Sequence, residues 1–237
     1  MADFVYPPIV LAAKSVFKGL GIKFVIEGAE NLPREGGVVL AINHTSYLDF
    51  ALGGIPAERI GRHVRFMAKD GIFKHKIAGP LMRGMKHIPV DREAGSQSFR
   101  DAVGALKAGE IVGVFPEATM SKSFEIKEFK NGAVRMAMSA KTPIVPMIIY
   151  GGQRILYYGH KDLTRGRTVC LTIGEPMYPE RGQDADALTV ELRSRMQTLL
   201  DQTLDRYPAP LPGEDAWWLP RRRGGTAPEY VPEAPDA

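Results

Sequence analysis

The chain has a single cysteine, Cys170, among 237 residues, so an intrachain disulfide is impossible. The thiol stands in the strand-like run Val169–Ile173, which indicates a buried, unreactive group and fits a reducing compartment. There is no apolar run of about 18 residues, and the N-terminus lacks the basic segment, apolar stretch and cleavage site of a signal peptide. We therefore expect a cytoplasmic protein that neither crosses a membrane nor is exported.

Several catalytic signatures are also missing. The chain has no Gly-x-Ser-x-Gly turn for a serine hydrolase, and its five histidines do not show the His-Glu-x-x-His spacing of a zinc site. A zinc-thiolate site would need a cysteine pair. The segment Gly19-Leu20-Gly21 lacks the third glycine of a dinucleotide fingerprint and precedes a strand instead of following one. We expect no resident metal or cofactor.

Positive charge is concentrated in one stretch. The net charge is +4, and between Arg59 and Arg92 nine cationic residues are opposed only by Asp70 and Asp91. Such a cluster attracts phosphates of a soluble molecule, a lipid headgroup or a nucleic acid, although a solvated basic face has the same composition. Because nucleic-acid binding would rest on this modest charge alone, no nucleic-acid partner is expected.

The order of apolar patterns predicts one α/β domain. Strand-like runs rich in β-branched residues occur at 23–26, 38–42, 64–67, 111–115, 144–149 and 169–173. Helical patterns separate them, one from Ser96 to a stop at Gly109 and another over 188–200. This alternation predicts a single domain, residues 23–207, with a mixed, mostly parallel sheet covered by helices.

The two ends of the chain differ from this domain. Residues 1–22 have apolar residues at helical spacing flanked by lysines, which predicts an amphipathic helix that lies on a bilayer or packs on the domain. Residues 208–237 are rich in proline, glycine and charge, which predicts a disordered tail. Within it, Trp217-Trp218 precede Arg221–Arg223, a combination that suits an anionic membrane surface. Packing of the two tryptophans onto the domain is the alternative.

The most informative feature is a histidine and an aspartate with four residues between them, His44 and Asp49, where an apolar strand gives way to a helix. Residues five apart in an ideal helix are offset by about 140°, so His44 must precede the helix if the two are to meet. Ser46 is the predicted N-cap, which turns the Asp49 carboxylate back toward the imidazole. A carboxylate on one ring nitrogen raises the basicity of the other, as a general base needs. Alternatively, Asp49 only caps the helix and His44 is an ordinary loop residue.

A second candidate segment, residues 113–123, is an apolar strand that stops at a proline and continues into small hydroxyl residues. Ligands bind at strand ends in α/β sheets. Here Glu117 is predicted to accept a hydrogen bond from a substrate hydroxyl, and Ser121, Lys122 and Ser123 to donate to a phosphate. A turn with a solvated acid is the alternative.

Two further segments accompany these. Residues 84–92 end on Arg92, whose planar guanidinium suits a phosphate or carboxylate. Residues 141–148 form an apolar strand that contains two prolines, which predicts an edge or irregular strand beside the site.

In this order and spacing the four segments resemble the glycerolipid acyltransferase family, which includes the 1-acylglycerol-3-phosphate (lysophosphatidic acid) acyltransferases. The resemblance covers roughly residues 25–174. The first block, from Asn43-His44 to Asp49, is matched fully, the arginine of the second falls on Arg92, and the proline-bearing fourth falls on 144–148. The third block departs from the usual Phe-Pro-Glu-Gly-Thr-Arg-Ser, because Ala118 replaces the glycine and Met120 the arginine.

The resemblance implies direct acyl transfer from a thioester, on coenzyme A or an acyl carrier protein, to the hydroxyl of a lyso-lipid. His44 would take the proton of the acceptor and Asp49 would orient the imidazole. Substrate would be held by a set that spans the second and third blocks: Arg92, Glu117, Thr119, Ser121 and Lys122. The loss of an arginine at Met120 concerns the acceptor phosphate, which Lys122 would then bind, and Ala118 implies a changed turn.

This assignment implies a peripheral enzyme of phospholipid biosynthesis at the inner face of the cell membrane, because both substrates carry acyl chains. Two other functions fit the same residues. One is a non-catalytic, membrane-associated lipid-binding protein with the acyltransferase fold, and the other is an acyltransferase with a different acceptor. The intact His44 and Asp49 favour an enzyme, since a lipid-binding scaffold needs neither.

Overall fold

A computed structural model describes residues 4–91, 95–211 and 213–231. Within these residues the main sheet has seven strands in the order β1-β9-β6-β2-β5-β3-β4. Every neighbouring pair is parallel except β6 and β9, which confirms the predicted mixed, mostly parallel sheet. The strands are β1 (Lys23–Glu27), β2 (Val38–Ile42), β3 (Val64–Lys69), β4 (Ile88–Val90), β5 (Ile111–Val114), β6 (Ile144–Tyr150) and β9 (Thr168–Ile173).

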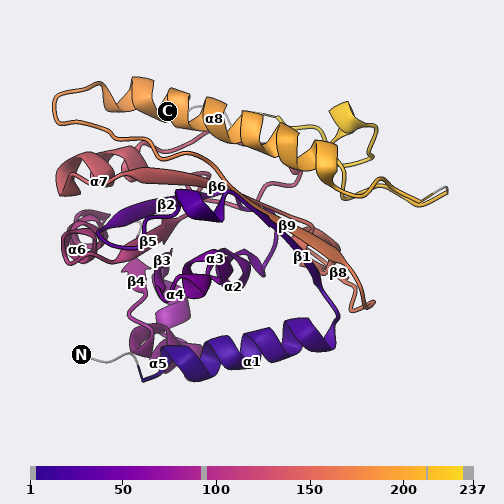
Figure 1. Cartoon of the computed structure of the whole chain (residues 1–237), viewed down its shortest axis with the longest axis horizontal. Coiled ribbons are helices and arrows are strands. Elements are labelled where there is room, and N and C mark those ends of the chain that lie inside the picture. The colour runs from indigo at the N-terminus through magenta and orange to yellow at the C-terminus, as the bar shows by residue number, and fades with distance from the viewer. Residues whose placement is uncertain (1–3, 92–94, 212, 232–237) are drawn as a thin grey trace.

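Helices cover both faces of this sheet (Figure 1). On one face, buried side chains of α6 (Gly95–Lys107), α7 (Gly132–Ala140) and α8 (Ala185–Arg206) form a core with alternate residues of the strands. On the other face the core is completed by α1 (Tyr6–Gly19), α2 (Asp49–Gly53) and α3 (Ile55–Arg59). The short helices α4 (Asp70–Phe73) and α5 (Ala78–Gly84) follow β3, and a small hairpin of β7 (Leu156–Tyr157) and β8 (His160–Lys161) follows β6. The sheet is therefore buried on both sides, as its continuous apolar strands require.

The central strands explain why the chain folds around this sheet. All residues of β2 and β6 are buried, and both strands are rich in Val and Ile, whose branched side chains pack well on a pleated surface. Position Gly113 in β5 is also constrained, because an added Cβ would lie 2.7 Å from the ring of Phe66 and from Val64. Because β2 pairs in parallel with both β5 and β6, the carboxyl ends of these three strands lie side by side.

The strand with two prolines was predicted to be an edge or an irregular strand; the edge position is wrong, whereas the irregularity is present. β6 lies between β2 and β9 in the interior of the sheet. The interruption is local: Pro146 falls between the last β6–β9 pair, Met147 with Ile173, and an isolated bridge from Ile144 to Met177. The missing N–H therefore coincides with a break in the ladder, where proline is tolerated even inside a sheet.

For residues 213–231 the expectation of a disordered tail is also wrong. The side chain of Trp218 is 1% exposed and packs in the core against α8 and β6, and Trp217 is partly buried beside it. The alternative considered for the two tryptophans is the one that the structure shows. Composition is a poor guide here because two large aromatic side chains bury enough apolar surface to order a short segment.

The N-terminal helix is present as predicted. Only Tyr6 and Phe17 of α1 are fully buried, and most of its other apolar residues are partly or well exposed. Among the described residues, no helix combines the length and the hydropathy that crossing a bilayer would require.

Candidate active site

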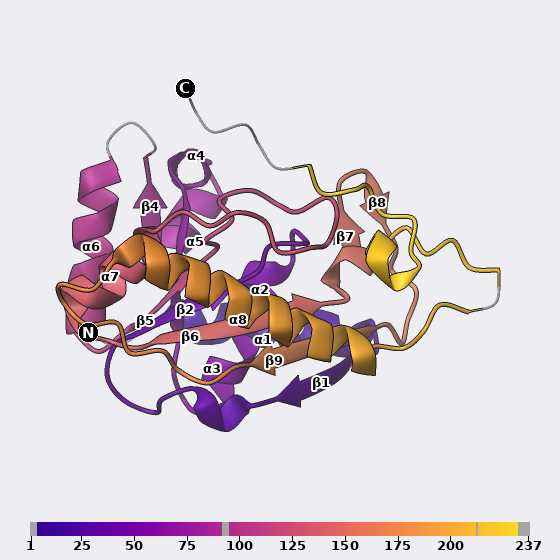
Figure 2. The same ribbon diagram turned by 90° about the horizontal axis from the view of Figure 1, so that it is seen from above.

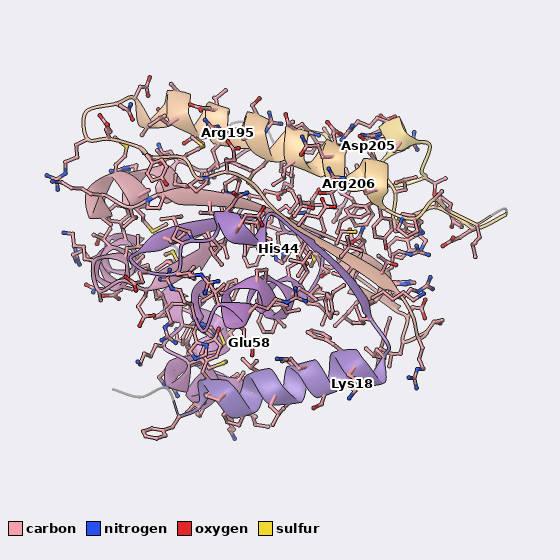
Figure 3. All side chains as sticks on the ribbon, in the orientation of Figure 1. Lys18, His44, Glu58, Arg195, Asp205 and Arg206 are labelled. Carbon is pink, nitrogen blue, oxygen red and sulfur yellow. The ribbon has the colours of Figure 1, made fainter. Side chains whose placement is uncertain are left out.

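The predicted catalytic residues lie at the carboxyl end of the parallel strands. His44 follows the end of β2 (Figure 3), and the segment 115–125 follows the end of β5, which is the neighbour of β2. Asn43 fixes the backbone at this point: its amide donates to the carbonyl of Ile149 at 3.0 Å and accepts from the N–H of Ile149 at 2.7 Å. This pair of hydrogen bonds joins the end of β2 to the end of β6 and leaves the next residue, His44, at the rim of the sheet.

His44 and Asp49 form a dyad. Nδ1 of His44 lies 2.9 Å from Oδ2 of Asp49. Since an ionised carboxylate only accepts, Nδ1 carries the proton in the neutral imidazole and Nε2 has the lone pair. The His44 side chain is 25% exposed, whereas that of Asp49 is 0% exposed, so the base faces the surface and the acid that orients it lies beneath. This arrangement is the one that a general base needs.

The Asp49 carboxylate is held by the turn that it helps to form. Oδ2 accepts from the backbone N–H groups of Thr45 at 2.6 Å and Ser46 at 2.7 Å, and Oδ1 accepts from the Ser46 hydroxyl at 2.6 Å. These bonds compensate for the burial of the charge and fix its direction. The prediction that Asp49 turns back toward the imidazole is correct in geometry, but Ser46 is not the N-cap. The helix begins at Asp49 with Leu48 as its N-cap, because Ser46 belongs to the turn.

The other side of the imidazole is packed against an aromatic ring. The rings of His44 and Phe115 stack with their centroids 4.4 Å apart, and Phe115 in turn stacks on Phe66 at 6.1 Å. The backbone carbonyl of His44 accepts from the N–H of Ser121 at 2.7 Å. The histidine is thus held by its Nδ1, by its ring face and by its backbone, which limits the rotations available to it.

Glu117 lies beside the dyad, as its place in the sequence predicts, and its carboxyl group is buried. Oε1 accepts from the backbone N–H of His44 at 3.0 Å and Oε2 from that of Lys127 at 3.2 Å. Burial raises the pKa of Glu117 to about 8, against the opposing effect of these two N–H groups and the Lys127 charge. Glu117 therefore links the end of β2 to the segment after β5, and its predicted hydrogen bond to a substrate hydroxyl stays a prediction.

The remaining substrate residues divide into two groups. Thr119 and Lys122 are exposed on the segment that follows β5. The Thr119 hydroxyl accepts from the Lys127 amine, and the Lys122 amine lies 5.9 Å from the centre of the Tyr158 ring. Ser121 is buried, and its hydroxyl donates to the carbonyl of Glu125 at 2.8 Å, which makes it part of the loop framework. Arg92 lies outside the described residues, and its role stays a prediction.

The two departures in the third block have different consequences. Ala118 has φ +59°, the left-handed conformation that glycine adopts without strain. Ala118 therefore adopts the positive φ that we expected an alanine at this position to disfavour. Met120 is buried and uncharged, so the position at which the family carries an arginine offers no group that could bind a phosphate.

An apolar cavity of about 350 Å³ lies under α1. It is lined by residues of α1, α2, α3 and β3 together with Gly54, Met85 and His87. Phe66 belongs to this lining and is also part of the stack that ends on His44. The base is consequently two aromatic rings from a space of the size and polarity that suit an acyl chain.

Sequence reasoning missed three contributors to this site: Asn43, Phe115 and Lys127. A signal existed for Asn43, because an amide directly after a fully apolar strand can pair with the backbone of a neighbouring strand. Nothing in the sequence distinguished Phe115 from a core residue. Lys127 comes into contact only because the segment after β5 doubles back.

The sequence of the chain is similar to a known protein family and to several known proteins. The family model described as Acyltransferase matches residues 23–150. The chain is 33% identical over 193 residues to the 1-acyl-sn-glycerol-3-phosphate acyltransferase of Bacillus subtilis (strain 168), covering 77% of this chain and 91% of that protein. It is 32% identical to a chloroplastic 1-acyl-sn-glycerol-3-phosphate acyltransferase of Arabidopsis thaliana, over 76% of this chain and 49% of that longer protein.

The fold agrees with a solved structure. The crystal structure of the 1-acyl-sn-glycerophosphate (LPA) acyltransferase PlsC from Thermotoga maritima matches with a TM-score of 0.71 and 25% identity, covering 85% of this chain and 80% of that one. Because the family model spans residues 23–150 and the Bacillus subtilis protein is 33% identical over most of both chains, the chain belongs to the acyltransferase family.

Proposed function

We propose that the protein transfers a fatty acyl group from an acyl thioester to the hydroxyl of a lysophospholipid such as 1-acylglycerol-3-phosphate, in phospholipid biosynthesis. The observation that carries the proposal is the His44–Asp49 contact of 2.9 Å, with the acid buried and the base partly exposed. The names of the similar proteins from Bacillus subtilis and Thermotoga maritima support the reaction.

The geometry of the dyad supports a single-step reaction. Nε2 of His44 takes the proton of the acceptor hydroxyl while the oxygen attacks the thioester carbonyl carbon. The C–O bond forms, the C–S bond breaks, and the thiolate leaves with the proton that the imidazolium returns. Asp49 stabilises the imidazolium through Nδ1. A single transfer of this kind needs no covalent acyl-enzyme.

The two substrates fit different parts of the site. We place the acyl chain of the thioester donor in the apolar cavity beneath α1, because the wall of this cavity includes Phe66 of the aromatic stack. The exposed Lys122 and the Lys127 amine beside Thr119 supply positive charge for the acceptor phosphate. This would compensate for the absence of an arginine at Met120. The donor is a fatty acyl thioester of coenzyme A or of an acyl carrier protein.

Peripheral association with a membrane surface completes the proposal. Exposed apolar side chains occur on α1 and around α4 and α5: Leu11, Val16, Ile72, Ile77 and Leu81. Cations accompany them: Lys14 and Lys18 lie in α1, Lys69 and Lys74 flank α4, and Arg83 lies in α5. Apolar residues mixed with cations suit an anionic bilayer, from which both lipid substrates would be drawn.

The proposal is tested by release of free thiol. Purified protein is incubated with palmitoyl-coenzyme A or palmitoyl-carrier protein and, separately, with 1-acylglycerol-3-phosphate, 1-acylglycerophosphocholine or monoacylglycerol as acceptor. We expect thiol release that needs an acceptor and a product of matching mass. His44→Ala and Asp49→Asn should each lower turnover by about 100-fold or more, since each removes general-base catalysis.

The same experiment decides between the alternatives. Transfer to monoacylglycerol in preference to the phosphate-bearing acceptors would favour the different-acceptor function suggested by Met120. No thiol release with any combination, together with saturable binding of lyso-lipid, would establish the non-catalytic lipid-binding protein instead.

A further inference from the structure

The C-terminal segment, residues 213–231, lies against the part of the chain that carries the active-site loop. Figure 2 shows this segment, in yellow, beside β7 and β8 and at the end of α8. We use the name active-site loop for residues 115–125, which follow β5 and include three residues that contact His44: Phe115, Glu117 and Ser121.

The segment is anchored by Trp218. Its backbone carbonyl accepts from the hydroxyl of Tyr150, the last residue of β6, at 2.7 Å, and its indole N–H donates to Glu214 at 3.1 Å. The guanidinium of Arg154 lies 4.0 Å from the centre of the indole ring and pairs with Glu214. A buried aromatic residue with its polar groups satisfied makes a stable attachment.

Two side chains reach from this anchor to the active-site loop. The ring of Trp217 meets the ring of Phe124 edge to face, with centroids 6.0 Å apart. Nε of Arg222 donates to Glu125 at 2.7 Å, and the same guanidinium reaches Asp201 of α8 at 2.5 Å. Arg222 therefore ties the loop to α8 through one planar group, a role that the fork of arginine performs well.

The contacted loop residues lead directly to the catalytic histidine. The carbonyl of Glu125 accepts from the hydroxyl of Ser121 at 2.8 Å, and the N–H of Ser121 donates to the carbonyl of His44 at 2.7 Å. Phe124, between them, has φ +58°, a conformation that a non-glycine residue keeps only when its surroundings hold it. Trp217 and Arg222 are part of those surroundings.

We infer that the C-terminal segment is part of the active-site scaffold, with Arg222 and Trp217 as positioning residues that hold the active-site loop where it orients His44. The inference rests on the proposed acyl transfer and extends it. It also replaces the membrane anchor that the sequence suggested: Trp218 is buried, and Arg221, Arg222 and Arg223 are all paired with carboxylates of the domain or of the segment itself.

The chain supplies a matched pair of variants. Arg222 and Arg223 both pair with Asp201 of α8, but only Arg222 contacts the loop; Arg223 contacts Asp205 instead. Arg222→Gln and Arg223→Gln therefore remove the same charge and similar contacts to α8. We expect Arg222→Gln to lower kcat about threefold to fivefold, the effect of one partly exposed ion pair, with the KM for the donor unchanged. Arg223→Gln should retain the wild-type kcat.

Hydrogen exchange gives a second measurement that does not depend on activity. In Arg222→Gln the exchange of the Ser121 amide should rise about threefold to fivefold, and in Trp217→Ala about tenfold, while in Arg223→Gln it should match the wild type. Because Glu125 is the partner on the loop, adding Glu125→Gln to Arg222→Gln should cause little further change in either measurement.

The outcomes separate this inference from the proposed function. Equal kcat and equal Ser121 exchange in Arg222→Gln and Arg223→Gln would overturn the inference, whatever the activity of the wild type. If the wild type transfers no acyl group, acyl transfer fails and positioning for catalysis fails with it, and exchange then decides only whether the segment holds the loop.

Discussion

Ala118 is a residue whose backbone keeps a conformation that its side chain disfavours. With φ +59° it costs roughly 1–2 kcal/mol relative to a right-handed conformation, and glycine would avoid that cost. Part of the gain is offset because glycine has more freedom in the unfolded chain. We expect Ala118→Gly to raise the free energy of unfolding by about 0.5–1 kcal/mol, as measured by urea denaturation.

A control for this change is available at Lys141, which has φ 57° at the end of α7. Lys141→Gly should stabilise by a similar amount without affecting the active-site loop. If Ala118→Gly lowers the free energy of unfolding while Lys141→Gly raises it, the positive φ of Ala118 does not destabilise the protein.

Glu117 makes the stability of the protein depend on pH. Its pKa is raised by burial from an ordinary value near 4.5 to about 8, so the folded state holds this proton more tightly than the unfolded chain does. Its contribution is fully present below about pH 4.5 and is lost as the pH rises through about 8. The Glu117→Gln variant cannot ionise at this position and lacks this dependence.

We therefore expect the free energy of unfolding of the wild type, minus that of Glu117→Gln, to fall between pH 4.5 and about 8. Urea denaturation of both proteins at several pH values measures this difference, in which the titration of all other groups cancels. A difference that rises with pH over this range would show that the two backbone N–H groups outweigh burial and stabilise the carboxylate.

At the scale of elements, the sequence predicted the long buried strands and the long helices because each shows a characteristic apolar pattern over its whole length. The run 38–42 became β2 without change, and the pattern over 188–200 became part of α8. The short strands β4, β7 and β8 were not predicted, because pieces of two or three residues show no period and form only where a neighbour is already in place.

The central position of β6 could not be predicted for a related reason. A proline excludes one hydrogen bond, but whether that bond would have existed depends on where the neighbouring strand ends, which is a property of the tertiary structure. The dyad was predictable because His44, Ser46 and Asp49 are neighbours in sequence. The roles of Phe115 and Lys127 were not, since both arise from contacts between separate segments.

The cavity between α1 and the rest of the domain is the place that we propose for the acyl chain of the donor. Ala13 of α1 lines it, whereas Ser15 on the same helix is exposed and does not. Ala13→Trp should fill part of the space and shift the ratio of kcat/KM for palmitoyl over decanoyl thioesters about tenfold toward the shorter chain, the effect of one or two methylene groups in an apolar pocket.

Ser15→Trp adds the same side chain to the same helix and should leave the palmitoyl-to-decanoyl ratio unchanged. Melting temperatures of both variants show whether α1 still packs. Equal ratios in a folded Ala13→Trp protein would place the acyl chain somewhere other than this cavity.

For the whole molecule, the two covering layers differ in character. α8 lies on one side of the sheet with the C-terminal segment at its end, whereas α1 lies on the opposite side with α5 near its start (Figure 1). Gly84 of α5 comes so close to Val5 that an added Cβ would lie 2.8 Å from it. Composition left two possibilities open for each end, binding to a membrane or packing on the domain. Contacts within the protein occupy the aromatic and cationic groups of the C-terminal end, so we assign the proposed membrane association to the α1 side.

Three exposed apolar residues test this asymmetry. Leu11 in α1 and Ile77 before α5 are 66% and 73% exposed, and Val190 in α8 is 69% exposed. Burial of one such side chain in the bilayer interface contributes about 1–2 kcal/mol, so Leu11→Asp and Ile77→Asp should each weaken binding to vesicles of phosphatidylglycerol and phosphatidylcholine about tenfold. Val190→Asp adds the same charge at similar exposure on the other side and should bind like the wild type in a sedimentation assay. Equal losses in all three variants would mean that net charge, and not the α1 side, governs the association.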